Sequence, residues 1–142
     1  MKRLAITGAA LFAAMSVAAS LGAATTKPYA GEWKARVTAD QLLDNGIAQP
    51  QFKGVWKLTL TKDGAYRTYN PWDKWSSGVY SANATRILLS KDMGCLKAGL
   101  KGPGTYRWSL TKGKLKLTSV AIGNDNCGGR WQTISIPLWT RA

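Results

Sequence analysis

Apolar and polar side chains alternate most clearly in residues 54–69, which read GVWKLTLTKDGAYRTY. Every second residue from Trp56 to Leu60 is apolar, and such residues share one face of a strand because successive side chains point to opposite faces. Asp63-Gly64 follows as a turn, since glycine accepts the positive φ that a tight hairpin needs. The chain then returns as a partner strand. This stretch therefore predicts a β-hairpin.

The same alternation recurs along the rest of the chain, interrupted by turn residues. It predicts strands at residues 31–37, 55–61, 65–69, 78–81, 86–89, 104–110, 114–120 and 130–136. Short strands at spacings of about 8–12 residues are typical of an all-β barrel or sandwich. Sequential tight turns favour an antiparallel up-and-down barrel of about eight strands, which either holds one small ligand or is filled by its own side chains. An outer-membrane barrel is excluded, because outward positions such as Lys57 and Lys114 would face lipid.

One short helix is predicted after the first strand. Thr38 and Gln41 have the spacing of a capping box, and Gly46 can end the helix. The helix has only two leucines to bury, so we expect it to cover the barrel as a lid or plug. Residues 70–76 are predicted to be a loop, because Asn-Pro is a turn signal, and the glycine-rich residues 91–103 are predicted to be a second one.

Residues 1–24 have the order of a secretory signal peptide. Lys2-Arg3 comes first, an apolar run follows, and small residues lead up to Ala24. An uncleaved membrane anchor is the alternative, but the small residues favour cleavage. We therefore expect residues 25–142 to form a single secreted or periplasmic domain with no transmembrane segment.

The two cysteines, Cys95 and Cys127, both lie in the part that is predicted to be exported. In an oxidising compartment they most simply form one structural disulfide. A metal site is disfavoured because the chain has no histidine and no C-x-x-C spacing. The lack of histidine also excludes Ser-His-Asp and Cys-His catalysis, and no two carboxylates have a spacing typical of acid-base work. We expect no cofactor, and whether the protein is an enzyme stays open.

The charge is strongly basic. Loss of Lys2 and Arg3 with the leader lowers the formal net charge from +13 to +11. Such a balance concerns solubility and partners rather than fold. For an exported protein it favours acidic cell-surface polymers or lipids over nucleic acid as partners. The alternative is a solvated outer face, since no run of like charges stands out.

Two tripeptides, Gly31-Glu32-Trp33 and Gly54-Val55-Trp56, match the G-x-W motif that opens the barrel of lipocalin-like (calycin) proteins. The later segments GTYRWSL, KLKLTSV and DNCGGRW are also similar to those of small secreted bacterial proteins of lipocalin-like type. The chain thus resembles that group over most of its mature length, although the group's second motif, T-D-x-Y, is not found.

The resemblance implies that a tryptophan closes one barrel end and that an arginine from a late strand packs over it. Arg130, at the start of the predicted last strand, and Arg141 are the candidates for this arginine. The resemblance also implies binding of a small hydrophobic molecule inside the barrel.

The chain has seven tryptophans, and those on strands are expected to lie in the core. Trp72 and Trp75 fall in the predicted loop, where they would line the barrel mouth as apolar walls beside polar groups, or else form a local aromatic plug. The predicted ligand-binding wall consists of Trp72, Trp75, Tyr80, Tyr106 and Trp108.

The favoured function is therefore binding of a small hydrophobic or amphipathic molecule in a β-barrel. The alternative is a basic surface-binding module, either an inhibitor or a binder of an acidic cell-envelope polymer. A cofactor-free barrel cyclase or isomerase is the third hypothesis.

Overall fold

The computed structural model describes residues 27–72, 74–121 and 124–142. The predicted signal peptide, residues 1–24, lies outside the described residues. No helix within the described residues has both the length and the apolar character needed to cross a membrane.

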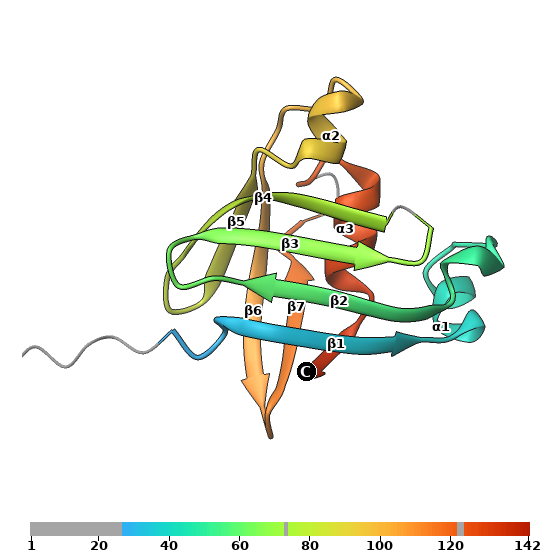
Figure 1. The fold of residues 1–142 in the computed structure, drawn as a ribbon, viewed down its shortest axis with the longest axis horizontal. Helices are drawn as coiled ribbons and strands as arrows, with labels where there is room; N and C mark the ends of the chain where they lie inside the picture. The colour runs from blue at the N-terminus through green and yellow to red at the C-terminus, as the bar shows by residue number, and fades with distance from the viewer. Residues whose placement is uncertain (1–26, 73, 122–123) are drawn as a thin grey trace, which may run out of the picture.

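Eight antiparallel strands close into a barrel (Figure 1). They are β1 Gly31–Val37, β2 Gly54–Leu60, β3 Ala65–Asn70, β4 Lys74–Ala82, β5 Arg86–Ser90, β6 Gly104–Thr111, β7 Lys114–Ser119 and β8 Leu138–Arg141. Each strand pairs with the next one along the chain, and β1 closes the barrel by pairing with β8. The predicted fold class, an up-and-down antiparallel barrel, is confirmed.

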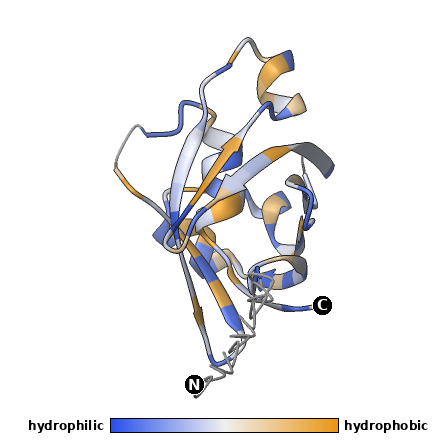
Figure 2. Cartoon of the chain, turned by 90° about the vertical axis from the view of Figure 1, so that its left-hand side faces the viewer, coloured by the Kyte–Doolittle hydropathy of each residue, from blue (hydrophilic) through white to orange (hydrophobic). Residues whose placement is uncertain are grey.

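The alternation in the sequence becomes an inside and an outside of this barrel. In β2, Trp56, Leu58 and Leu60 are buried, whereas Lys57 between them is exposed. Hydrophobic and hydrophilic positions are interleaved along the strands in Figure 2. Burial of the apolar face is the main favourable term that holds such a sheet closed.

The two ends of the barrel are built differently. One end carries the short turns of the hairpins β2–β3, β4–β5 and β6–β7. The other end carries every helix of the described residues. These are α1 Ala39–Asp44, the 3₁₀ helix η1 Pro50–Phe52, α2 Met93–Lys97 and α3 Gly128–Ser135. The predicted helix is α1, whose capping box between Thr38 and Gln41 is formed and which buries Leu42.

The predicted strand at residues 130–136 is wrong. These residues belong mostly to α3, and the eighth strand is β8, which follows Pro137. The buried residues of α3 are Arg130, Thr133 and Ile134, so they recur at helical spacing. The barrel closes through Trp139 of β8 instead, which is fully buried.

Two predicted loops are also shorter than expected. Strand β4 begins at Lys74, because Trp75 and Ser76 continue the ladder opposite Tyr69 and Thr68. The glycine-rich segment contains α2, whose N-terminus is capped by the Asp92 carboxylate.

Helix α3 lies behind β2 and β3 in Figure 1 and packs against β3 and β7. Asn70 of β3 donates to the Thr133 hydroxyl of α3 over 3.2 Å. Because β3 and β7 lie on different sides of the barrel, α3 covers the barrel opening between them. The barrel interior itself is filled, and its largest fully buried side chains are Trp33, Trp56, Trp139, Tyr66 and Tyr106.

Candidate functional site

The turn end of the barrel is sealed by an arginine stacked on a tryptophan. The guanidinium of Arg141 lies 4.0 Å from the ring centre of Trp33, and the indole N–H of Trp33 donates to the Tyr29 carbonyl over 2.8 Å. Gly31 has a φ of +136°, which favours glycine, and a Cβ there would lie 2.0 Å from the Arg141 guanidinium and displace it from the stack. Of the two candidate arginines, Arg141 takes this place, and Arg130 lies in α3.

Two of the predicted wall residues, Tyr80 and Trp108, also lie at this sealed end. The Tyr29 ring meets both edge-on, with ring centres 6.1 Å from Tyr80 and 5.0 Å from Trp108. The Tyr80 hydroxyl donates to the Thr61 carbonyl, and the Trp108 indole donates to the Asn83 carbonyl over 2.9 Å. Burial raises the pKa of Tyr80 to about 12, so its hydroxyl stays protonated and donating. Both rings pack against neighbouring rings instead of lining a cavity.

The second G-x-W motif repeats the first at the helical end. Trp56 is buried and donates to the Phe52 carbonyl over 2.7 Å, again a residue four positions earlier. Gly54 has a φ of +143°, and a Cβ there would lie 3.0 Å from the Pro71 ring. The two motifs sit at opposite ends because β1 and β2 run antiparallel, with Val37 opposite Gly54.

The helical end contains a cavity of about 350 Å³ between β3, β4, α2 and α3. Its lining residues are Thr68, Asn70, Lys74, Trp75, Ser76, Asp92, Gly94, Cys95, Ala98, Leu100, Cys127, Gly128, Gly129, Arg130 and Thr133. Several of these, such as Gly94, Ala98 and Gly129, are exposed, so the cavity opens to solvent. Its volume is within the range of small-molecule sites.

A buried ion pair supports the α3 side of this cavity. The Arg130 guanidinium donates to both carboxylate oxygens of Asp125, over 2.6 and 2.7 Å, and to the Gly102 carbonyl over 2.8 Å. The Tyr106 hydroxyl donates to the same carboxylate. Burial alone would lower the pKa of Arg130, but the hydrogen bonds and charge of Asp125 outweigh it and raise the pKa. Arg130 therefore remains charged.

A second buried carboxylate, Asp92, supports the α2 side. It accepts hydrogen bonds from the Tyr66 hydroxyl and from the Ser76 hydroxyl, each over 2.7 Å. Its third donor is the Cys95 backbone N–H, over 3.1 Å. Burial, followed by the hydrogen bond to Asp92, raises the pKa of Tyr66 far above its usual value. The Tyr66 hydroxyl is thus fixed as a donor.

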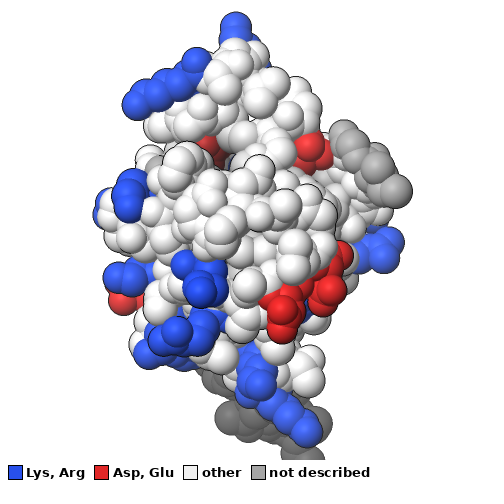
Figure 3. Space-filling view, turned by 90° about the vertical axis from the view of Figure 1, so that its right-hand side faces the viewer, with Lys and Arg blue, Asp and Glu red and all other residues white. Residues whose placement is uncertain are grey.

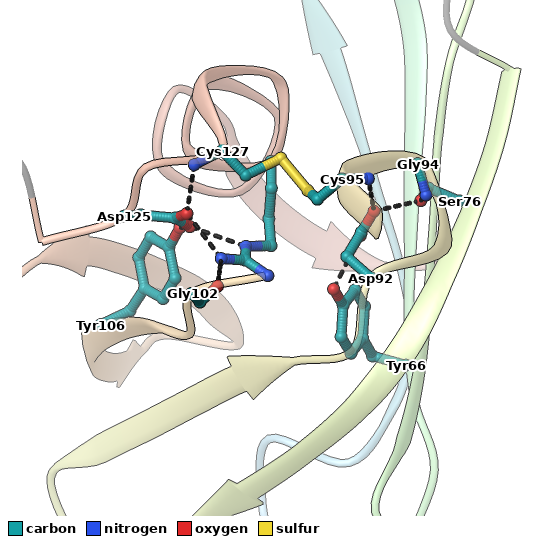
Figure 4. The surroundings of a disulfide bond; sticks show 10 residues. Tyr66, Ser76, Asp92, Gly94, Cys95, Gly102, Tyr106, Asp125 and Cys127 are labelled. Carbon is teal, nitrogen blue, oxygen red and sulfur yellow. Dashed lines mark hydrogen bonds and ion pairs between the residues drawn. A yellow bond between two sulfur atoms is a disulfide. The ribbon is translucent and has the colours of Figure 1, made fainter. Parts of the chain in front are cut away.

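The disulfide Cys95–Cys127 joins these two clusters, as Figure 4 shows. The predicted pairing is confirmed. The Asp125 carboxylate accepts the Cys127 backbone N–H over 2.9 Å, and Asp92 holds Cys95 in the same way. Each cysteine is therefore positioned by a buried aspartate that is also bonded to a barrel tyrosine. The disulfide crosses from α2 to the start of α3 and forms part of the cavity wall.

The predicted wall residues are not brought together. Among them only Trp75 lines the cavity, with about half of its side chain exposed. Trp72 is 57% exposed and packs against Phe52, with the two ring centres 6.2 Å apart. Tyr106 is fully buried beneath the ion pair. Whether any of the five contacts a ligand stays a prediction.

Sequence reasoning missed most of the groups that line the cavity. The capping position of Asp92 three residues before Cys95 was a readable signal, because aspartate is a preferred N-cap. No such signal marks the ion pair between Asp125 and Arg130 in the sequence, since a spacing of five residues matches no motif. Thr68 and Thr133 lie far apart in the sequence, and only folding brings both to the cavity wall.

The arrangement is suited to holding a molecule rather than to acid-base chemistry. Both buried carboxylates already accept three or more hydrogen bonds from the scaffold. In residues 27–72, 74–121 and 124–142, no three side chains of histidine, cysteine, aspartate or glutamate gather as metal ligands would.

The fold and cavity define a closed eight-stranded antiparallel barrel that is sealed at one end and covered by helices at the other. This architecture is compatible with a lipocalin-like fold. Comparisons with protein-family models, curated proteins and solved structures found no match for this chain.

Proposed function

We propose that the protein is an exported, lipocalin-like barrel that binds a small hydrophobic or amphipathic molecule. The observation that carries this proposal is the cavity of about 350 Å³ at the helical end, which lies between β3, β4, α2 and α3 and opens to solvent. Binding sites of this kind are concave and combine apolar walls with a few fixed polar groups.

The cavity wall has both kinds of surface. Ala98, Leu100 and the disulfide supply apolar contacts, while Thr68 and Thr133 supply hydroxyls. The buried aspartates and Arg130 are fixed by their own hydrogen bonds and keep the shape of the wall. A ligand with one apolar part and one hydrogen-bonding part fits this lining best.

Two further observations support the lipocalin-like and exported character. The stack of Arg141 on Trp33 is the contact that the resemblance implies. The disulfide is typical of proteins in oxidising compartments. The basic composition, with a formal net charge of +13, favours an acidic partner in addition to the small ligand.

Filling the cavity tests the proposal. A Cβ added at Gly129 meets no atom within 4 Å, so Gly129→Phe places a ring at the cavity wall without a backbone clash. The matched control is Ala39→Phe, on an exposed position of α1 away from the cavity. The probe is 8-anilino-1-naphthalenesulfonate, which has an apolar ring system and one anionic group.

We expect saturable probe binding to the wild-type protein and to Ala39→Phe, and at least tenfold weaker binding to Gly129→Phe at unchanged melting temperature. Native mass spectrometry of the wild-type protein as purified then gives the mass of any carried ligand. Equal probe affinity in all three proteins, or no saturable binding at all, would contradict the proposal.

A further inference from the structure

The outer surface of the barrel carries a row of mainly cationic and aromatic side chains, of which only Trp75 also lines the cavity. Across the ladder, Lys114 lies opposite Thr140, and Thr140 lies opposite Lys34. Lys34 in turn lies opposite Lys57. The row continues across Tyr69 and Trp75. We call this set, Lys114, Thr140, Lys34, Lys57, Tyr69 and Trp75, the outer row.

The outer row is accessible. All of its members are exposed except Tyr69, which is half-buried. It crosses six strands, from β7 through β8 and β1 to β4, so it spans about 24 Å at the usual strand spacing of about 4.8 Å. Figure 1 shows the outer face of β1, β2 and β3 turned toward the viewer.

The cations of the row are not neutralised by neighbours. Lys34 and Lys57 lie directly opposite each other, an arrangement that is destabilising between like charges. Within the described residues, the ion pair found is the buried one between Arg130 and Asp125, so neither lysine is paired with a carboxylate. In Figure 3, lysine and arginine side chains lie at the top, left, bottom and right of the face, one acidic side chain lies among those on the left, and the largest acidic cluster lies right of the centre. A bound anion would relieve this repulsion.

The aromatic end of the row is held in place by cations. The Tyr69 and Trp75 rings lie 5.1 Å apart, the Arg67 guanidinium lies 4.6 Å from the Trp75 ring, and the Lys57 ammonium lies 5.8 Å from the Tyr69 ring. Trp75 remains 49% exposed although it is a large apolar side chain. Exposed rings next to cations offer stacking surface for flat or ring-shaped groups that carry negative charge.

We propose that the outer row binds a linear acidic polysaccharide, with the lysines contacting its anionic groups and the aromatic end packing against its sugar rings. A flat lipid surface cannot contact both ends of a row that curves around six strands, whereas a flexible chain follows the curve. The disulfide argues for an oxidising compartment, where acidic glycans rather than nucleic acids are the available polymers.

The charged part is tested with the double variant Lys34→Gln/Lys57→Gln in the full chain. Its matched control, Lys97→Gln/Lys101→Gln, removes the same charge from exposed positions outside the row. The probe is polygalacturonate, and neutral dextran serves as the uncharged comparison. We expect at least tenfold weaker polygalacturonate binding in the outer-row variant, a change within twofold in the control, and a steep loss of wild-type affinity with salt.

The aromatic part is tested with Tyr69→Thr, which keeps a β-forming residue and leaves the charge unchanged. We expect at least threefold weaker polygalacturonate binding with the same salt dependence. Binding of 8-anilino-1-naphthalenesulfonate in the cavity should stay unchanged in both glutamine variants, whose lysines do not line the cavity, so the two proposals fail or hold separately.

Three results would overturn the assignment. An equal loss of polygalacturonate affinity in both double glutamine variants would mean that binding depends on net charge alone and not on the outer row. Unchanged binding in Tyr69→Thr would remove the aromatic end from the site. Tighter, row-dependent binding of a single-stranded oligonucleotide, or of vesicles containing phosphatidylglycerol, would assign the row to a different class of partner.

Discussion

At the scale of single residues, the cavity depends on charges that are buried and paired. The side chains of Arg130 and Asp125 are 2% and 0% exposed, so neither charge is solvated by bulk water. Such a pair is costly to bring out of water, and its value lies in the geometry that its hydrogen bonds impose. Here that geometry fixes the start of α3, the Gly102 carbonyl and the Tyr106 hydroxyl around one carboxylate.

Arg130→Met is expected to lower the free energy of unfolding by about 3 kcal/mol, because it leaves the Asp125 carboxylate buried without its counter-charge. Urea unfolding measures this, with the exposed Arg107→Met as control at less than about 0.5 kcal/mol. The double variant Asp125→Leu/Arg130→Met should lose less than the sum of the single losses, since the two residues are coupled. A loss below about 1 kcal/mol in Arg130→Met would show that the pair does not fix the helix.

At the scale of elements, α3 is the part of the fold that turns a closed barrel into one with a cavity. It packs between β3 and β7, and its first turn holds Gly128 and Gly129 at the cavity wall. Its far end is held by Lys116 of β7, whose ammonium donates to the Ser135, Ile136 and Pro137 carbonyls. Cations at a helix C-terminus stabilise the carbonyls that lack a partner within the helix.

Lys116→Met keeps the apolar stem of the side chain but removes these donors. We expect a loss of about 1.5–3 kcal/mol in the free energy of unfolding, because hydrogen bonds from a charged donor are lost at a half-buried position. Hydrogen exchange should speed up at residues 134–139 more than elsewhere. The neighbouring exposed Lys114→Met serves as the control, and identical behaviour of the two variants would exclude a role of Lys116 in holding α3.

Sequence reasoning reached the barrel but not α3, and the difference has a physical cause. Strands β2 and β7 each bury one face of an otherwise solvated ribbon, so their period of two is visible in the sequence. Helix α3 is short, and two of its three buried residues are an arginine and a threonine, so Ile134 alone is of the apolar kind that pattern reading looks for.

The five residues of the predicted wall lie apart because the fold places them at different ends and on different faces of the barrel. Tyr80 points inward and belongs to the same strand as Trp75, five residues earlier, so the two side chains face opposite sides of β4. The two residues share a strand because β4 begins at Lys74. The Asn-Pro turn signal had instead predicted a loop over residues 70–76. The disulfide was predictable because the chain has just two cysteines.

At the scale of the whole molecule, the two ends and the outer face have separate roles. The turn end is sealed by aromatic packing and the Arg141 stack, and the helical end holds the cavity. The outer row lies on the convex side of the barrel and shares only Trp75 with the cavity lining. A small ligand in the cavity and a polymer along the outer row would therefore meet only at Trp75.

The most direct test of the central claim is to locate a bound small molecule by amide chemical-shift mapping. The ¹⁵N-labelled wild-type protein is titrated with 8-anilino-1-naphthalenesulfonate under conditions where binding saturates. The account predicts that the largest shifts fall on cavity-lining amides, such as those of Gly94, Ala98, Gly128 and Gly129. Shifts centred on Tyr29 at the sealed end, or spread along the outer row, would contradict it.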